Sequence, residues 1–135
     1  MSQFPTPTRA LRQVILESPF SSPTWWGRLQ NKRYARKCVR DSLERGEAPF
    51  ASHLLYTQPG ILNDNIPEER RRGINAGLAW GMKAERTVVY VDRGITPGMA
   101  LGIKAAKEAG RPIEYRSLKK DLSSNWDPTW GNPYI

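Results

Sequence analysis

Four side chains in this sequence could do chemistry and stand at or near the ends of predicted strands: Glu17, His53, Asp64 and Asp92. A carboxylate can act as a nucleophile, an acid or a base, and a histidine can carry a proton near neutral pH. His53, the only histidine, could contact a ligand or simply fix the loop after its strand. A lone histidine without neighbouring cysteines or paired carboxylates makes a poor metal site, so we expect neither a metal nor a cofactor.

Glu17 stands out because it lies near the end of the apolar run RQVILES, residues 12–18. A carboxylate in such a run is costly unless it is paired or lies at the wet end of the strand. It could face a cleft with a raised pKa and act as an acid or base. The default expectation is instead a buried ion pair with an arginine such as Arg36 or Arg116.

The other candidates have structural alternatives of the same kind. Asp92 could bind ribose hydroxyls or a base edge, or it could form an Asx turn with the glycine that follows at position 94. Asp64 could reach the same cleft or be an ordinary polar loop residue. Of Trp25 and Trp26, we expect one to stack on a nucleobase and the other to pack on the protein.

The elements around these residues alternate between strands and helices. Apolar and β-branched runs predict strands at 12–18, 48–56, 86–91 and 112–116. Helical spacing predicts helices at 29–45, from 67 to about 82, and at 97–109. This order predicts an α/β fold, a three-layer doubly wound sandwich around a mostly parallel sheet of four to five strands.

In such sheets, ligands bind outside the carboxyl ends of the strands. The rule selects the loops 18–26, 52–64 and 92–99. The polar, aromatic and glycine residues in these loops are the predicted ligand-binding set: Ser18, Pro19, Phe20, Trp25, Trp26, His53, Asp64, Asp92, Gly94, Thr96, Gly98 and Met99.

Four segments together resemble the nucleoside 2-deoxyribosyltransferase-like family and its small phage and bacterial relatives. They are ILESPF at 15–20, GEAPFASHLLY at 46–56, NDxxPEERRRGINAGLAWG at 63–81 and VVYVDRGITPGM at 88–99. The resemblance implies the α/β fold above and a nucleoside or nucleotide ligand. It also implies a homo-oligomer, a dimer or larger.

The same resemblance identifies one departure. The family's enzymes cleave N-glycosidic bonds with a glutamate three residues after a Gly-Met pair, and here that position is Gly102. Glycine has no side chain and cannot be the nucleophile. We therefore expect binding of a nucleoside, nucleotide or nucleotide-derived signal without turnover, which in a phage would suit sequestering of an immune signal.

The alternative is an enzyme acting on an N-glycosidic bond: a nucleosidase, a nucleotide N-glycosidase or a 2-deoxyribosyltransferase. In that case Glu17, Asp64 or Asp92 would replace the missing glutamate.

Composition limits the remaining classes. The 135 residues carry a net charge of +8 and one cysteine, which excludes an internal disulfide. No nucleic-acid-binding signature accompanies the charge, so small anions are the expected partners rather than nucleic acid. No secretory signal or membrane span is evident, which makes a cytoplasmic location the expectation. We expect an extended arm at 1–11, one domain at 12–118 and an aromatic tail at 119–135.

Overall fold

The computed structural model describes residues 11–119, which form four strands and four helices in alternating order broken once. The expectations for the arm before residue 11 and for most of the tail lie outside the described residues. The elements are β1 (Arg12–Glu17), α1 (Trp25–Glu44), β2 (Glu47–Phe50), α2 (Ser52–Leu55), α3 (Pro67–Gly81), β3 (Arg86–Tyr90), α4 (Pro97–Glu108) and β4 (Ile113–Arg116).

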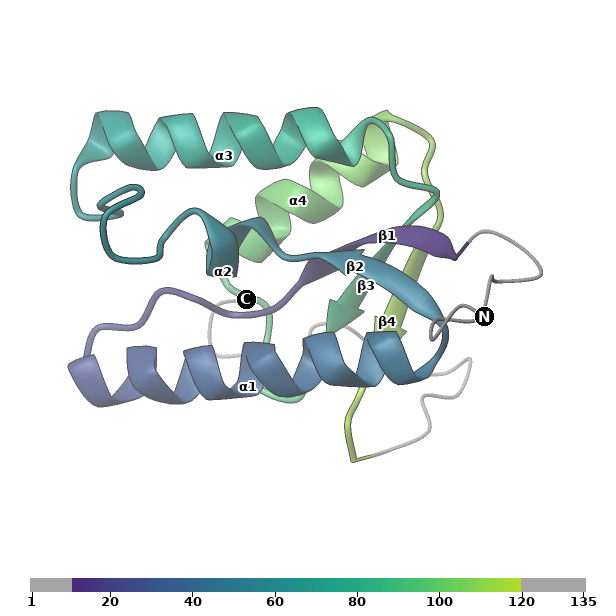
Figure 1. The fold of residues 1–135 in the computed structure, drawn as a ribbon, viewed down its shortest axis with the longest axis horizontal. Coiled ribbons are helices and arrows are strands. Elements are labelled where there is room, and N and C mark those ends of the chain that lie inside the picture. Colours follow the sequence, from purple (N-terminus) through teal and green to yellow (C-terminus); the bar gives the residue numbers. More distant parts are fainter. Residues whose placement is uncertain (1–10, 120–135) are drawn as a thin grey trace, which may run out of the picture.

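The four strands pair in the order β2-β1-β3-β4, and all pairs are parallel. The chain moves outward from β1 to β2, then back across β1 to β3 and on to β4. Right-handed crossovers therefore place α1 on one face of the sheet and α3 and α4 on the other (Figure 1). This confirms the predicted three-layer α/β fold, and it makes the β1–β3 boundary the point where strand order reverses.

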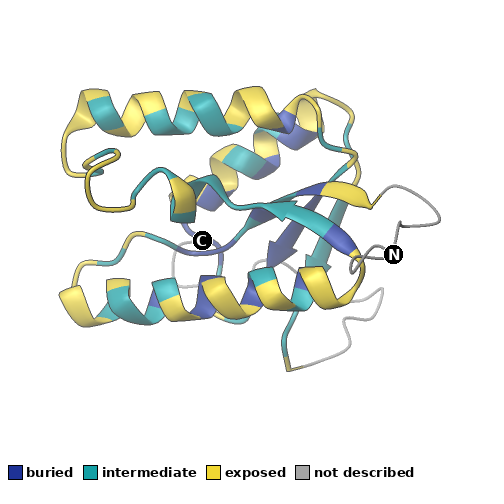
Figure 2. Cartoon of the chain, in the orientation of Figure 1, coloured by how far each residue is buried: buried dark blue, intermediate teal, exposed yellow. Residues whose placement is uncertain are grey.

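The alternation of side chains along β1 decides what each face contains. Val14 and Leu16 are buried against α1, in a core with Val88 and Tyr90 of β3 and Tyr34 and Cys38 of α1. Successive residues of a strand point to opposite faces, so Ile15 and Glu17 point toward α3 and α4. On that second face, Val89 packs with Ile95, Met99 and Ile103. Figure 2 shows buried residues in the strands, α1 and α4, whereas α3 is mostly exposed or partly exposed.

Arg116 is buried under α1, but its partner is not Glu17. Its guanidinium makes two 2.7 Å contacts with the Glu47 carboxylate, which also accepts a 2.8 Å bond from the Ser42 hydroxyl. Arg36 is exposed. Within residues 11–119 Glu17 forms no salt bridge, so the expected ion pair with Arg36 or Arg116 is wrong. The β1 alternation explains this, because Glu17 points to the opposite face from Glu47.

The second predicted strand is also shorter than expected. β2 pairs with β1 over only four residues, Glu47–Phe50, and the chain then turns into the short helix α2. Ser52 packs against α3 at Gly77, where an added Cβ would lie 2.6 Å from the Ser52 hydroxyl. The absent side chain at 77 leaves room for α2, and the turn carries His53 back toward the end of β1.

α4 approaches the end of β1 closely because residue 102 is glycine. A Cβ at Gly102 would lie 2.1 Å from Oε2 of Glu17 and 2.5 Å from its Cδ. No real Cβ tolerates such distances, so the Glu17 carboxyl occupies the space where a side chain from α4 would begin. The sequence pattern suggested that glycine served helix packing, and its packing partner is this carboxyl group.

This contact predicts a coupling between positions 17 and 102. In a Glu17→Ala background, Gly102→Ala should stabilise the protein by about 1 kcal/mol, the ordinary helix-propensity gain over glycine. In the native background Gly102→Ala should increase the free energy of unfolding by less, or should decrease it, because the new Cβ displaces the Glu17 carboxyl. Chemical denaturation of the four proteins of the double-mutant cycle measures the difference.

Gly98→Ala is the matched control, since the nearest atom to a Cβ there is 3.9 Å away. Its effect should be the same with and without Glu17. Additive effects of Glu17→Ala and Gly102→Ala would contradict the contact.

Candidate functional site

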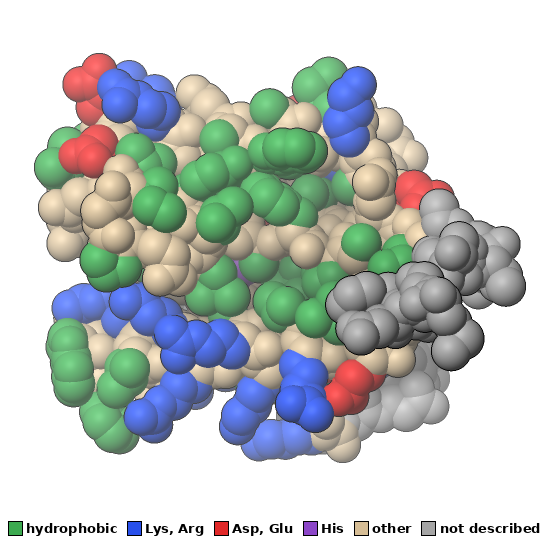
Figure 3. Space-filling view, in the orientation of Figure 1, with side chains coloured by type: hydrophobic (Ala, Val, Ile, Leu, Met, Phe, Trp, Pro, Cys, Tyr) green, Lys and Arg blue, Asp and Glu red, His purple; other side chains and the backbone are tan. Residues whose placement is uncertain are grey.

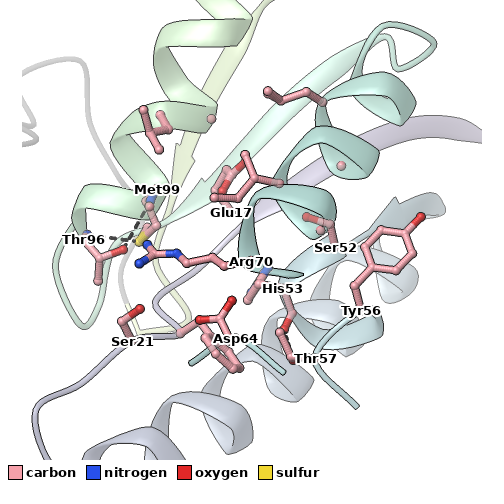
Figure 4. Close-up of a pocket in the computed structure, with 18 of the residues that line it drawn as sticks. Glu17, Ser21, Ser52, His53, Tyr56, Thr57, Asp64, Arg70, Thr96 and Met99 are labelled. Atoms are coloured by element: carbon pink, nitrogen blue, oxygen red, sulfur yellow. Dashed lines mark hydrogen bonds between the residues drawn. The ribbon is translucent and has the colours of Figure 1, made fainter. Parts of the chain in front are cut away.

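A cavity of about 130 Å³ opens between the end of β1, α2, α3 and the start of α4. Glu17 lies deep in it, between α3 and α4, and Ser21, Asp64 and Thr57 lie at the opposite end (Figure 4). The wall formed by α3 contains Gly73, Gly77 and Gly81, four residues apart on one helix face. The cavity thus lies at the reversal point of the sheet, as expected for this fold.

The Glu17 carboxyl lies at the deep end of the cavity. Its side chain is half-buried, and desolvation raises its pKa to about 8, although the charge of Arg111 acts in the opposite direction. Arg111 is held by a 2.9 Å bond to the Thr87 hydroxyl and a 2.6 Å bond to the Gly81 carbonyl. At neutral pH the carboxyl is therefore mostly protonated in the empty cavity and can donate a hydrogen bond.

A serine–histidine pair stands beside Glu17. The hydroxyl of Ser18, which is buried, lies 2.7 Å from Nε2 of His53. Burial lowers the pKa of His53 to about 4, so the ring is neutral at physiological pH. Either group can be the donor of this bond, and the pair presents neutral polar atoms to the cavity.

The start of α4 closes the cavity from the β3 side. The Thr96 hydroxyl accepts the 3.2 Å bond from the Met99 backbone N–H and so begins the helix. Thr96, Gly98 and Met99 all line the cavity. Met99 is buried, and its side chain joins the apolar cluster under α4.

The structure brings eight of the residues singled out from the sequence into one cavity. They come from all three predicted loops and from the end of β1: Glu17, Ser18, Phe20, His53, Asp64, Thr96, Gly98 and Met99. Pro19, Gly94, Trp25, Trp26 and Asp92 are not among its lining residues.

Asp92 forms a structural junction instead. Its carboxylate accepts bonds from the Tyr34 hydroxyl at 2.6 Å, from the Leu118 backbone N–H at 2.9 Å and from the Ser117 hydroxyl. Burial alone would raise the pKa of Asp92, but these donors hold it below its usual value. Asp92 thus ties the segment after β4 to α1, and its acceptor capacity is used within the protein.

The two tryptophans lie on the first turn of α1, with 67% of Trp25 and 56% of Trp26 exposed. Their ring centroids are 6.2 Å apart. The structure therefore places neither ring against the cavity.

Sequence reasoning missed Tyr56 and Arg111, and it did not single out Arg70 from the run of three arginines at 70–72, of which one could reach a ligand phosphate. Arg70 lines the cavity from α3 and Tyr56 from the end of α2, and Arg111 lines it near Glu17. The spacing of Gly73, Gly77 and Gly81 was the available signal for α3, since a glycine every fourth residue leaves a bare helix face. For Arg111 no sequence signal existed, because it follows α4 in a turn far from the other loops.

No helix in the described part of the chain is long and apolar enough to cross a membrane. Residues 11–119 also contain no group of three or more His, Cys, Asp or Glu side chains that could hold a metal ion.

The raised pKa of Glu17 predicts a pH dependence of stability. In the unfolded chain the group titrates near 4.5 and in the native cavity near 8, so the native state binds more protons between these values. Its contribution to stability is complete below pH 4.5 and is lost as pH rises to about 8. Glu17→Gln should therefore flatten the fall in unfolding free energy between pH 6.5 and 8.

His53 acts in the opposite direction, because its contribution is lost as pH falls from 6.5 toward 4, and this window lies below the test range. Urea denaturation at pH 6.5, 7.3 and 8 measures the effect, with Glu68→Gln on the exposed side of α3 as the control. Parallel pH profiles for native protein and Glu17→Gln would show that Glu17 titrates normally.

A search of solved structures finds a similar fold in the 2-deoxyribosyltransferase of Bacillus psychrosaccharolyticus, which is described as a biocatalyst for nucleoside synthesis. The TM-score is 0.55, with 20% sequence identity over 83% of this chain and 77% of that one. At this identity the likeness shows the fold. No curated protein matches the chain in sequence.

A family model described as a domain of unknown function, DUF7768, matches residues 12–116, from the first residue of β1 to the last residue of β4. Because this match covers most of the chain, the protein belongs to the DUF7768 family.

Proposed function

We propose that the cavity binds a nucleoside or nucleotide, with the Glu17 carboxyl as its principal polar contact. The observation that carries the proposal is this protonatable carboxyl deep in a small cavity at the reversal point of a deoxyribosyltransferase-like sheet. An enclosed volume of about 150 Å³ accommodates a single benzene-sized ring. The 130 Å³ here suits one ring of a nucleoside, with the rest of the ligand directed toward the mouth.

The surrounding side chains suit a neutral polar ring rather than a charged group. Glu17 is mostly protonated near pH 7 and His53 is neutral, so these two side chains offer hydrogen bonds without charge. Arg111, which also lines the cavity, has its guanidinium bonded to the Thr87 hydroxyl and the Gly81 carbonyl. Phe20 and Met99 add apolar surface. A sugar with its hydroxyls, or a heterocyclic base, combines these two properties.

A second candidate function is cleavage of an N-glycosidic bond, and one specific observation favours it. Glu17 reaches from β1 into the space where a side chain at position 102 would begin. The family resemblance places the catalytic glutamate at that position, so a carboxylate is present near the expected place although it comes from another element. In such chemistry a carboxylate beside the anomeric carbon stabilises the oxocarbenium-like transition state.

The ionisation of Glu17 distinguishes the two candidates. A nucleophile must be deprotonated, which a pKa of about 8 disfavours at pH 7 unless the ligand alters it. Binding without turnover requires only the neutral carboxyl. The first candidate therefore needs no further assumption, and it would suit a protein that holds a nucleotide signal.

The binding proposal predicts stabilisation by ligand. A nucleoside or nucleotide at millimolar concentration should raise the melting temperature by several degrees, because binding at 100 times Kd contributes about 2.7 kcal/mol. His53→Ala should weaken the shift by removing a polar contact at the cavity. Trp26→Ala is the control and should leave the shift unchanged, since Trp26 does not line the cavity. The absence of a shift with every purine and pyrimidine nucleoside and nucleotide would refute the proposal.

The second candidate predicts a different result. Incubation with deoxynucleosides, ribonucleosides and their 5′-phosphates should release free base, detected by chromatography, at a rate that rises with pH toward about 8 as Glu17 ionises. Glu17→Gln should lower the rate by several orders of magnitude. If native protein binds ligand but releases no base at pH 8.5, binding is the function; base release that Glu17→Gln leaves unchanged would exclude Glu17 as the catalyst.

A further inference from the structure

A second and larger hollow adjoins the cavity on the side of α1. It measures about 700 Å³ and lies between the first half of α1 and the loop at 57–66. Phe20, Ser21, Asp64 and Arg70 line both hollows, so the two hollows are direct neighbours. A ligand held by Glu17 in the inner cavity can therefore extend into this outer groove.

Cations dominate the charge of the outer groove. Arg28 and Lys32 contribute from α1 and Arg70 from α3, against the carboxylates of Asp64 and Glu69. Within the described residues none of the three cations forms a salt bridge. Glu69 is partly engaged, because its Oε1 accepts a 3.2 Å bond from the Asn63 backbone N–H. The lining thus holds three cations against two carboxylates, and of these cations Arg28 also donates a 3.0 Å bond to the Ser22 carbonyl.

α1 extends this charge beyond the groove. Arg28, Lys32 and Arg36 recur every four residues, on one face of the helix, and no acidic residue occurs in α1 before Asp41. Figure 3 shows Lys and Arg side chains gathered over α1, in the lower part of the view. Like charges at this spacing each cost about 0.2–0.5 kcal/mol in an isolated helix. The column is therefore slightly unfavourable for the helix alone, and an anion beside it would relieve this repulsion.

We propose that the outer groove binds the di- or triphosphate of a nucleotide whose sugar or base occupies the inner cavity. This rests on the proposed function and makes it more specific, since a plain nucleoside would leave the groove empty. The groove has several times the volume of the inner cavity. This volume is larger than one phosphate group would fill. Guanidinium and ammonium groups from two helices suit a chain of phosphates, with arginine able to bind oxygens in pairs.

The experiment compares a nucleoside, its 5′-monophosphate and its 5′-triphosphate for each common base, by calorimetric titration at fixed ionic strength near 0.1 M. The triphosphate should bind at least about tenfold more tightly than the nucleoside, as expected for one or two charge-assisted contacts. The advantage should shrink as salt is raised, because the groove is open to solvent.

Two matched pairs of variants locate the effect. Lys32→Gln should reduce the affinity for the triphosphate severalfold and leave nucleoside affinity unchanged, because Lys32 lines only the outer groove. Arg70→Gln, at a residue that also lines the inner cavity, should reduce the affinity for the triphosphate more than the affinity for the nucleoside. Lys37→Gln, on the same helix, and Arg72→Gln, in the same arginine run, carry identical charge changes outside both hollows. They should have little effect, whereas equal losses for all four would indicate nonspecific attraction by net charge and would overturn the site.

Inorganic tripolyphosphate separates this inference from the proposed function. If nucleoside and triphosphate bind equally, the groove assignment fails and the proposed function stands. If neither binds, the proposed function fails, and the binding of tripolyphosphate alone tests the groove. Tripolyphosphate binding that depends on Lys32 and Arg70 supports a polyphosphate site, and the absence of tripolyphosphate binding overturns it.

Discussion

The contact between the Glu17 carboxyl and the bare α-carbon of Gly102 is the constraint on which the candidate site depends. The carboxyl occupies the space that a side chain at position 102 would fill, and it places an ionisable group where α4 itself offers none. The raised pKa of Glu17 follows from the same arrangement, because the helix removes water from the carboxyl. One glycine thus determines both the shape of the cavity at its deep end and the chemistry available there.

The opposite face of the sheet serves the fold rather than the site. There Arg116, Glu47 and Ser42 form a buried polar group under α1, and Asp92 joins Tyr34 to the segment after β4. Removing one partner from such a group leaves a buried charge, which is strongly unfavourable. The buried ionic groups on this face have partners, and Glu17 on the cavity face does not pair. This contrast is what distinguishes a candidate functional carboxyl from structural ones in this protein.

The fold could be predicted from sequence because strand and helix patterns alternate clearly and glycines or prolines mark most boundaries. The strand β3 and the helix start at Pro97 are examples. The candidate site was only partly predictable. The loops were identified by the rule for parallel sheets, but the direction of each side chain depends on register. Glu17 ends β1 and Asp92 follows β3 by two residues, yet only Glu17 lines the cavity. Arg111 could not be found at all, since its role depends on a turn packing beneath β1.

Gly73, Gly77 and Gly81 expose main chain on the wall that α3 contributes to the cavity. An added Cβ at these positions would meet Leu62, Ser52 and Arg111 respectively, so each glycine also seats a different neighbour. Substitution of these three glycines can therefore only narrow the cavity. A larger ligand would require shorter side chains elsewhere on the same helix, at Ile74 or Leu78, which line the cavity beside them.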